Sequence, residues 1–323
     1  MTKCILVAFH PGCFNPSGHY RVYEDAWMKC WSRWAHLFDK VYLIDHNWDF
    51  DPSKLSDKFQ LFTVKKSHWD NLKEIIPQIK EDWILMMDCD TLFYDGQEMS
   101  RLLNSPDFAM IDLAAILDGS GGVDLSKKYP EMAPNKYRGE RRRIAPYLCF
   151  IKTELMKKTS MDFSPYHSGQ NDWRDSFGKW TEEVLDFSPT FLELPDDRTT
   201  LRLEKNGTIS KDSWLDGPGY KWSEPLDAPQ RYGYYHIRNF SLGLYLVNTF
   251  FHDRVNYEKA KRITPFSEAL RVLTWLYVVA DAAKTPLAIF PITDVIDDFG
   301  VSIKTWNNYW SKFKDYHSWV KDL

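Results

Sequence analysis

Two aspartates, Asp88 and Asp90, follow a run of apolar residues in the segment Trp83-Ile84-Leu85-Met86-Met87-Asp88-Cys89-Asp90. Alternate side chains of an extended strand share a face, so both carboxylates are expected on one face, with Cys89 on the other. Two carboxylates placed together suit a hard divalent cation such as Mg²⁺ or Mn²⁺. The pattern alone also fits solvated loop acids, helix caps, or a pair in which one carboxylate is a nucleophile.

The apolar segments around this pair predict the elements that would position it. Four strands are predicted, over residues 5–9, 41–45, 59–64 and 83–93. Helices are expected over residues 20–38 and 69–79. This alternation predicts an α/β domain with a mostly parallel central sheet. In such sheets ligands bind beyond the carboxyl ends of the strands, which is where the two aspartates lie.

The remainder of the chain predicts further strands, one long loop and a helical end. Strands are expected over residues 108–113, 146–151, 191–194 and 234–237. Residues 118–143 are rich in Gly, Pro, Lys and Arg and predict a long surface loop. From residue 265 onward the pattern is helical. We therefore expect a catalytic domain over residues 1–250 and a helical extension over residues 251–323 that packs on it.

The segment from Ile84 to Phe93 resembles the D-x-D segment of the GT-A nucleotide-sugar glycosyltransferases. The order of elements up to residue 240 is also similar to that family. The resemblance implies a GT-A-like, Rossmann-like fold and a divalent cation, Mn²⁺ or Mg²⁺, that grips the diphosphate of a nucleotide-sugar donor. It implies that Asp90 binds the metal directly, and that Asp88 contacts the ribose or a metal-bound water. The cation would act as a Lewis acid on the departing nucleoside diphosphate.

The same resemblance implies roles for residues elsewhere in the chain. His236, after the aromatic pair Tyr234-Tyr235, matches a late metal ligand, and Arg238 is placed to pair with phosphate oxygens. Phe9, His10 and Asp45 stand at ends of early strands, where the family builds its pocket for base and ribose. The alternatives are a structural histidine, a surface ion pair for Arg238 and a turn cap for Asp45. The nucleotide stays undetermined.

An acceptor hydroxyl needs a base if the sugar is transferred with inversion. Asp175 and Glu182 are the candidates, in a segment that also carries Trp173 and Trp180 as possible stacking surfaces for sugars. Ordinary acids at a helix N-terminus explain Glu182 equally well. The stereochemical course is open, and so is the acceptor: a saccharide or other glycan is favoured, and modified nucleic acid is an alternative.

Four arginines are concentrated in the segment Arg138-Gly139-Glu140-Arg141-Arg142-Arg143. A solvated charge run in the predicted loop is the favoured interpretation. A lid over the donor phosphates is the sharper alternative. Contact with an anionic acceptor, including nucleic acid, is a third.

Two other functions compete with glycosyl transfer. A haloacid-dehalogenase-like phosphatase also has an apolar strand leading into D-x-D, and Asp297-Asp298 resembles the distal acidic pair of that family. Against it, Thr91 follows Asp90 directly, whereas that family has one residue between them, and three strands precede the motif here. A non-catalytic nucleotide-sugar-binding protein is the second alternative.

Composition limits the remaining classes. The chain of 323 residues has 41 basic and 45 acidic residues, a net charge of −4, which does not indicate nucleic-acid binding through bulk charge. Its five cysteines are scattered without a CxxC pair, which favours free thiols in a reducing compartment. The N-terminus does not resemble a signal peptide, and the apolar run 269–283 contains Arg271 and Asp281. These features predict a cytoplasmic protein; its oligomeric state stays undetermined.

Overall fold

The structure is a computed structural model, and it falls into two compact units. The first comprises residues 1–10, 35–89 and 100–196, and the second comprises residues 11–34, 90–99 and 197–323. The residues that the structure describes are 1–9, 35–45, 56–63, 67–88, 91–93, 97–124, 141–167, 173–174, 176–194, 199–213, 234–236, 240–282, 292–318 and 320. These units are groups of residues in contact. The sequence-based domains 1–250 and 251–323 remain a prediction.

The first unit is built on a seven-stranded sheet in the order β10-β6-β7-β4-β1-β2-β3. Its strands are β1 (Lys3–Phe9), β2 (Lys40–Asp45), β3 (Phe59–Thr63), β4 (Trp83–Asp88), β6 (Leu113–Asp124), β7 (Arg141–Lys152) and β10 (Phe191–Glu193). The pairs β1–β2, β2–β3, β1–β4 and β6–β10 are parallel, and only β7 runs antiparallel to its neighbours. The predicted α/β class with a mostly parallel central sheet is therefore confirmed.

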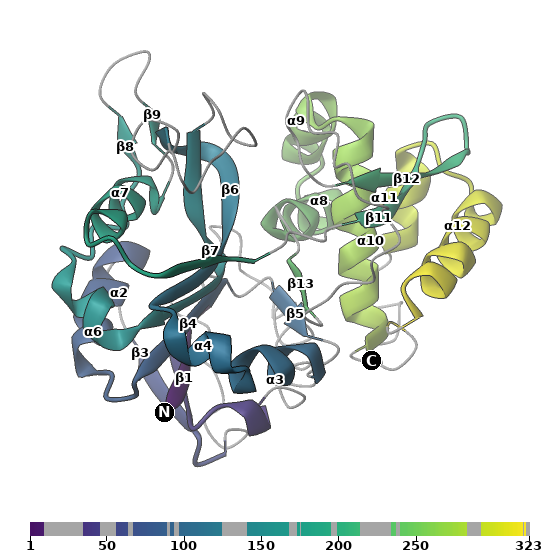
Figure 1. The fold of residues 1–323 in the computed structure, drawn as a ribbon. Coiled ribbons are helices and arrows are strands. Elements are labelled where there is room, and N and C mark those ends of the chain that lie inside the picture. The colour runs from purple at the N-terminus through teal and green to yellow at the C-terminus, as the bar shows by residue number, and fades with distance from the viewer. Residues whose placement is uncertain are drawn as a thin grey trace. The chain divides into compact units, whose positions relative to one another are not determined.

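Helices cover both faces of this sheet (Figure 1). The helical elements of the first unit are η2 (Ala35–Leu37), α2 (His68–Ile75), η4 (Ile76–Gln78), α4 (Pro106–Met110), α6 (Thr153–Lys158) and α7 (Gly178–Asp186). On one face, Leu6, Ile84 and Met86 pack against apolar residues of α2, α6 and α7. On the other face, the Phe108 ring of α4 contacts Trp83, with ring centroids 4.5 Å apart. Alternation along the strands thus divides the core into two layers.

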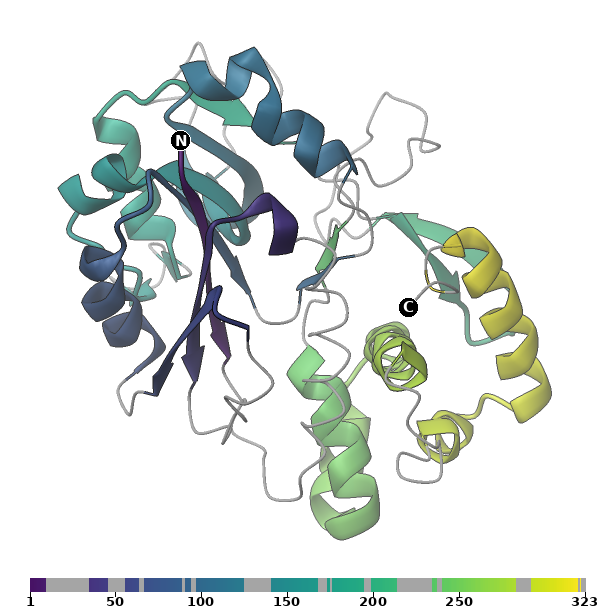
Figure 2. The same ribbon diagram turned by 90° about the horizontal axis from the view of Figure 1, so that it is seen from below.

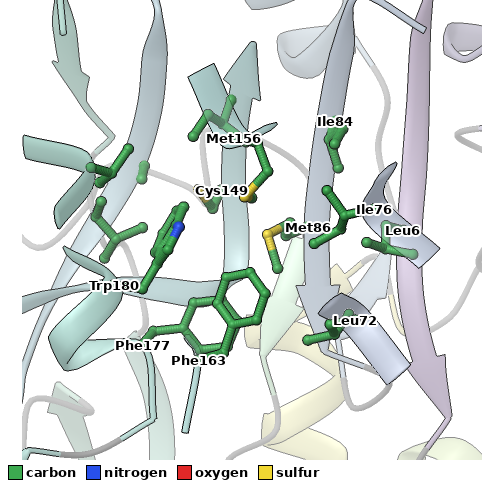
Figure 3. Packing of buried hydrophobic residues seen from close by; sticks show 14 of the residues in the cluster. Leu6, Leu72, Ile76, Ile84, Met86, Cys149, Met156, Phe163, Phe177 and Trp180 are labelled. Atoms are coloured by element: carbon green, nitrogen blue, oxygen red, sulfur yellow. The ribbon is translucent and has the colours of Figure 1, made fainter. Parts of the chain in front are cut away.

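An aromatic cluster closes the face beneath α7 (Figure 3). Phe163 and Phe177 stack with ring centroids 4.7 Å apart, and Trp180 contacts both rings. The Trp180 side chain is fully buried, and its Nε1 donates a hydrogen bond to Thr159 Oγ1 at 3.0 Å. Phe177 has a positive φ of 67°, a left-handed conformation at which α7 begins. The packing of Phe177 and Trp180, together with the hydrogen bond from Trp180 to Thr159, therefore holds the first turn of α7 in place.

The second unit is mainly helical. It contains β5 (Thr91–Phe93), β11 (Thr199–Leu203), β12 (Ile209–Ser213), β13 (Tyr234–His236), α8 (Phe240–His252), α9 (Arg254–Ile263), α10 (Phe266–Ala282), α11 (Ile292–Asp298) and α12 (Ile303–Tyr316). Figure 2 shows α10 nearly end-on, between α8, α11 and α12. Trp306, Trp310 and Phe313 of α12 are buried within this unit, whereas Ile303 is exposed. Among the described helices, none has the length and apolar character that a membrane crossing requires.

Three expectations about local structure are corrected. Residues 108–113 do not form one strand, because Ser105 caps α4 by accepting a hydrogen bond from the Phe108 N–H, and β6 begins only at Leu113. The predicted loop 118–143 is strand at both ends, where β6 and β7 pair as far as Asp124 and Arg141. The predicted strand 83–93 is divided into β4 and β5, which belong to different sheets.

The remaining elements are short, and the residues of one of them are divided between the two units. These are α3 (Gln97–Asn104), which contributes residues to both units, and the strand pair β8 (Tyr166–His167) and β9 (Trp173–Arg174) of the first unit. The predicted helix over 20–38 lies largely outside the described residues, and its last part is the short η2. The predicted helix over 69–79 is confirmed as α2 and η4.

The second unit should lose stability in mild acid because of His317. The side chain is 2% exposed among the rings of Trp275, Phe313 and Tyr316, and burial lowers its pKa to about 3. Below pH 6.5 the unfolded chain binds a proton at this histidine and the folded protein does not, so the free energy of unfolding falls as pH falls. We expect a loss of about 2 kcal/mol between pH 7 and pH 5 from this residue.

Urea unfolding at the two pH values measures this loss. His317→Leu should remove about 2 kcal/mol of the difference between pH 7 and pH 5. His36→Leu, at an exposed histidine of η2, is the control and should leave the difference unchanged. An equal pH dependence in wild type and His317→Leu would contradict the assignment.

Candidate active site

Three of the predicted site residues lie at the carboxyl ends of central strands in the seven-stranded sheet. Phe9 ends β1 and is the register partner of Asp45, the last residue of β2. On the other side of β1, Ala8 is the register partner of Asp88, the last residue of β4. The carboxyl ends of three adjacent parallel strands therefore meet, and β1 lies where the strand order turns from β2 to β4. Open α/β sheets bind ligands at such a position.

The backbone alternation assigns these positions to different faces of the sheet. Asp88 continues the series of Ile84 and Met86, which pack toward α2 and α7. On β1 and β2, positions 9 and 45 alternate to the other face of the sheet, away from α2 and α7. Asp88 is half-buried. His10 lies outside the described residues, and so its predicted role in the nucleotide pocket stays a prediction.

The second half of the D-x-D motif belongs to the second unit. Asp90 lies outside the described residues, but β5 begins at the next residue, Thr91, and pairs antiparallel with β13. In this ladder His236 is the register partner of Thr91. The backbone thus brings position 236 opposite the residue that follows Asp90, although the two are far apart in sequence. Arg238 lies outside the described residues.

Whether a divalent cation can bind near Thr91 depends on which oxygen and nitrogen atoms the neighbouring residues supply. Carboxylate oxygens and an imidazole nitrogen, as Asp90 and His236 would supply, are suitable ligands for Mn²⁺. The Thr91 hydroxyl is fully buried and has no hydrogen-bond partner in the part of the chain that the structure describes. The described side chains alone contain no cluster of three His, Cys, Asp or Glu residues. Asp90 and the side chain of His236 are not among them.

The predicted solvated charge run is wrong for two of its four arginines, which are buried at the start of β7, whereas Arg138 and the side chain of Arg141 lie outside the described residues. Arg142 and Arg143 are 4% and 8% exposed, because β7 pairs with β6 from Arg141 onward. Arg142 Nη1 donates to Leu117 O at 3.3 Å, and Arg143 Nη1 donates to Ser176 O and to its Oγ. Arg143 thereby holds the residue after Asp175 against the sheet. The sequence did not predict this burial, because a run of charged residues is ordinarily exposed to solvent.

The acceptor-side segment is only partly available to substrate. Trp180 lies in the core and does not offer a stacking surface for a sugar. Glu182 is half-buried within α7, in its second turn, and so it is not an acid that precedes the helix. Glu183 accepts hydrogen bonds from the Ser160 N–H and Oγ. Asp175 lies outside the described residues, and of Trp173 only the backbone, in β9, is described.

Asp298, which the phosphatase interpretation used as a distal acid, is held by three partners. Its carboxylate accepts hydrogen bonds from Arg254 at 2.8 Å, Tyr257 at 2.7 Å and Lys261 at 2.5 Å. Burial alone would raise the pKa of Asp298, but the hydrogen bonds from Lys261, Tyr257 and Arg254 outweigh it and lower the pKa to about 2. This arrangement joins α9 to α11 and makes Asp298 a structural carboxylate.

Comparison with known proteins gives distant structural similarity only. No model of a protein family matches the sequence, and no curated protein sequence matches it. The bifunctional IspDF from Campylobacter jejuni has a TM-score of 0.37 and 14% identity over 60% of this chain. This chain covers 49% of IspDF, about half of its length.

Two further solved structures are similar at the same distance. The 4-diphosphocytidyl-2C-methyl-D-erythritol synthase from Anaerococcus prevotii has a TM-score of 0.37 and 11% identity, over 60% of this chain and 87% of its own. Glucosyl-3-phosphoglycerate synthase from Mycobacterium tuberculosis has a TM-score of 0.34 and 12% identity, over 59% and 68%. These values do not define a family for the chain.

Proposed function

We propose that the protein is a metal-dependent glycosyltransferase that moves a sugar from a nucleoside-diphosphate sugar to an acceptor hydroxyl. The observation that carries the proposal is the meeting of Phe9, Asp45 and Asp88 at the carboxyl ends of three adjacent strands. This is the position at which open α/β sheets bind nucleotides. It gives the D-x-D motif the structural context that a short sequence match lacks.

Each residue would have a separate task. Asp90, together with His236, would hold Mn²⁺ or Mg²⁺, and Asp88 would contact the ribose or a cation-bound water. When bound, the cation neutralises charge on the leaving nucleoside diphosphate. Asp45 would accept hydrogen bonds from the nucleoside, and Arg238 would pair with its phosphates.

On the acceptor side, a carboxylate would take the proton of the acceptor hydroxyl. Asp175 and Glu182 are the proposed bases for the acceptor hydroxyl. The contact between Arg143 and Ser176 supports Asp175, because it fixes the backbone next to that residue. A saccharide or other glycan is the proposed acceptor.

The two competing functions are less well supported. A phosphatase of the haloacid-dehalogenase type would need its distal acids for Mg²⁺, whereas Asp298 is engaged by Arg254 and Lys261. A non-catalytic nucleotide-sugar-binding protein would bind its ligand at the same carboxyl ends of the strands. It would differ from the enzyme only in that it does not transfer the sugar.

A thermal-shift screen of nucleoside diphosphates and their sugars tests the proposal. One nucleotide, with Mn²⁺ or Mg²⁺ but not with a chelator, should stabilise the protein by about 2.7 kcal/mol at a concentration of 100 times its Kd. This corresponds to a rise of several degrees in Tm. The absence of any response to uridine, guanosine, adenosine and cytidine diphosphates would overturn it. Binding without donor hydrolysis or transfer would establish the non-catalytic alternative.

A further inference from the structure

The Thr91 hydroxyl differs from the other buried threonine hydroxyls. Those of Thr153, Thr159, Thr181, Thr249 and Thr274 each donate a hydrogen bond to a backbone carbonyl. Thr91 is 0% exposed, and its Oγ1 has no partner within the described part of the chain. Four of the others bond a carbonyl three or four residues earlier in a helix or turn. Thr91 lies in the strand β5, where that local partner is not in reach.

A buried hydroxyl without a partner has an energetic cost. Leaving a buried polar group unsatisfied destabilises the folded protein, and valine would fill nearly the same volume without that penalty. Nearly all buried polar groups in folded proteins are hydrogen-bonded, so an exception indicates a ligand, ion or water. The unsatisfied Thr91 Oγ1 is therefore a candidate position for a bound ion or water.

The position of Thr91 indicates which group that is. Thr91 directly follows Asp90 and is the register partner of His236, so the two proposed metal ligands adjoin it along the chain and across the ladder. Residues directly opposite in an antiparallel pair lie on the same face, with Cβ atoms about 4.5–5.5 Å apart. A cation held at position 236 would therefore lie on the face of the ladder that carries the side chain of residue 91.

We propose that the Thr91 hydroxyl is a third group of the cation site, bonded to the cation or to a water that the cation holds. A hydroxyl can do either, since it is both a donor and an acceptor. The inference rests on the proposed function, from which it takes the metal ligands Asp90 and His236. The inference assigns to Thr91, an uncharged residue outside the D-x-D motif, a role in stabilising the bound cation.

Mn²⁺ binding to the isolated protein, measured by electron paramagnetic resonance without nucleotide, tests the inference. Thr91→Val should weaken Mn²⁺ binding about 10- to 100-fold, as loss of an outer partner of a metal site does. Thr91→Ser keeps the hydroxyl and should stay within about threefold of wild type. The unliganded Thr91→Val protein should be at least as stable as wild type, because the change removes an unsatisfied group.

A matched control and a second variant separate the outcomes. Thr249→Val, at a buried threonine whose hydroxyl bonds Tyr245 O, should lower stability and leave Mn²⁺ affinity unchanged. Thr91→Ala replaces Thr91→Val if the latter does not fold, with the same expected loss. Wild-type Mn²⁺ affinity in both hydroxyl-free variants would overturn the inference alone. A wild-type protein that binds neither Mn²⁺ nor any nucleotide would overturn the proposed function, and the inference with it.

Discussion

Asp90→Ala is expected to abolish the metal-dependent stabilisation by nucleotide. A carboxylate that binds a divalent cation directly cannot be replaced by a methyl group, and the remaining proposed groups, His236 and Thr91, would hold the cation too weakly. We expect at least a 100-fold loss of Mn²⁺ affinity, which removes about 2.7 kcal/mol of nucleotide-dependent stabilisation. The measurement is the thermal shift of the variant with nucleotide, with and without Mn²⁺.

The two aspartates should differ in this assay. Asp88→Ala should weaken nucleotide binding by about tenfold, equivalent to about 1.4 kcal/mol, because Asp88 is proposed to contact ribose or cation-bound water. Asp107→Ala, at an exposed acid in the first turn of α4, is the control for loss of one negative charge. A larger effect at Asp88 than at Asp90 would reverse the assigned roles. A full metal-dependent shift in Asp90→Ala would contradict the metal site.

Trp180→Ala should be among the most destabilising single changes in the first unit. It removes a fully buried indole from contact with Phe163 and Phe177, and it leaves Thr159 Oγ1 with the Met161 N–H as its remaining donor. Truncation of a buried tryptophan to alanine costs about 3–5 kcal/mol, since the cavity does not collapse fully. Urea unfolding at pH 7 measures the change in the free energy of unfolding.

Two further variants separate packing from hydrogen bonding at this cluster. Trp180→Phe keeps most of the ring and loses the Nε1 donor, so its cost should be about 1–2 kcal/mol. Trp69→Ala removes a half-buried ring that contacts Phe177 at the rim of the cluster and should cost less than Trp180→Ala. A cost below about 1 kcal/mol for Trp180→Ala would show that the cluster does not depend on this ring.

Local patterns were sufficient to predict the early strands of the sheet. The apolar runs of β1, β2 and β4 identify buried strands whatever their neighbours are, so Phe9, Asp45 and Asp88 could be placed at strand ends. Residues 108–113, which include the end of α4, were predicted as a strand because they form an almost continuous apolar run, although Ser105 and Pro106 mark a helix start. Apolar character was the wrong criterion for a helix of one turn and a half.

Other features depend on contacts that are distant in sequence. The burial of Arg142 and Arg143 results from pairing with β6 and from the carbonyl groups of Leu117 and Ser176. The helix α8 is apolar on most of its surface and lacks a clear helical period, so no element was predicted there. The pairing of Thr91 with His236 joins two strands of three residues each, which are too short for a pattern to reveal their partner.

The pairing of β5 with β13 also has a consequence for the order in which the chain becomes functional during synthesis. Thr91 and His236 are 145 positions apart (236 − 91), whereas Trp83 and Lys152, paired in the sheet, are 69 apart (152 − 83). Doubling the length of a loop adds only about 0.6 kcal/mol to the cost of closing it. The β5–β13 pair therefore forms later mainly because β13 is synthesised later. All strands of the seven-stranded sheet precede β13 in the sequence and are therefore synthesised before it. A nascent chain can therefore assemble its seven-stranded sheet while the partner of Thr91 is still absent, and the proposed metal binding should be the last property that it acquires.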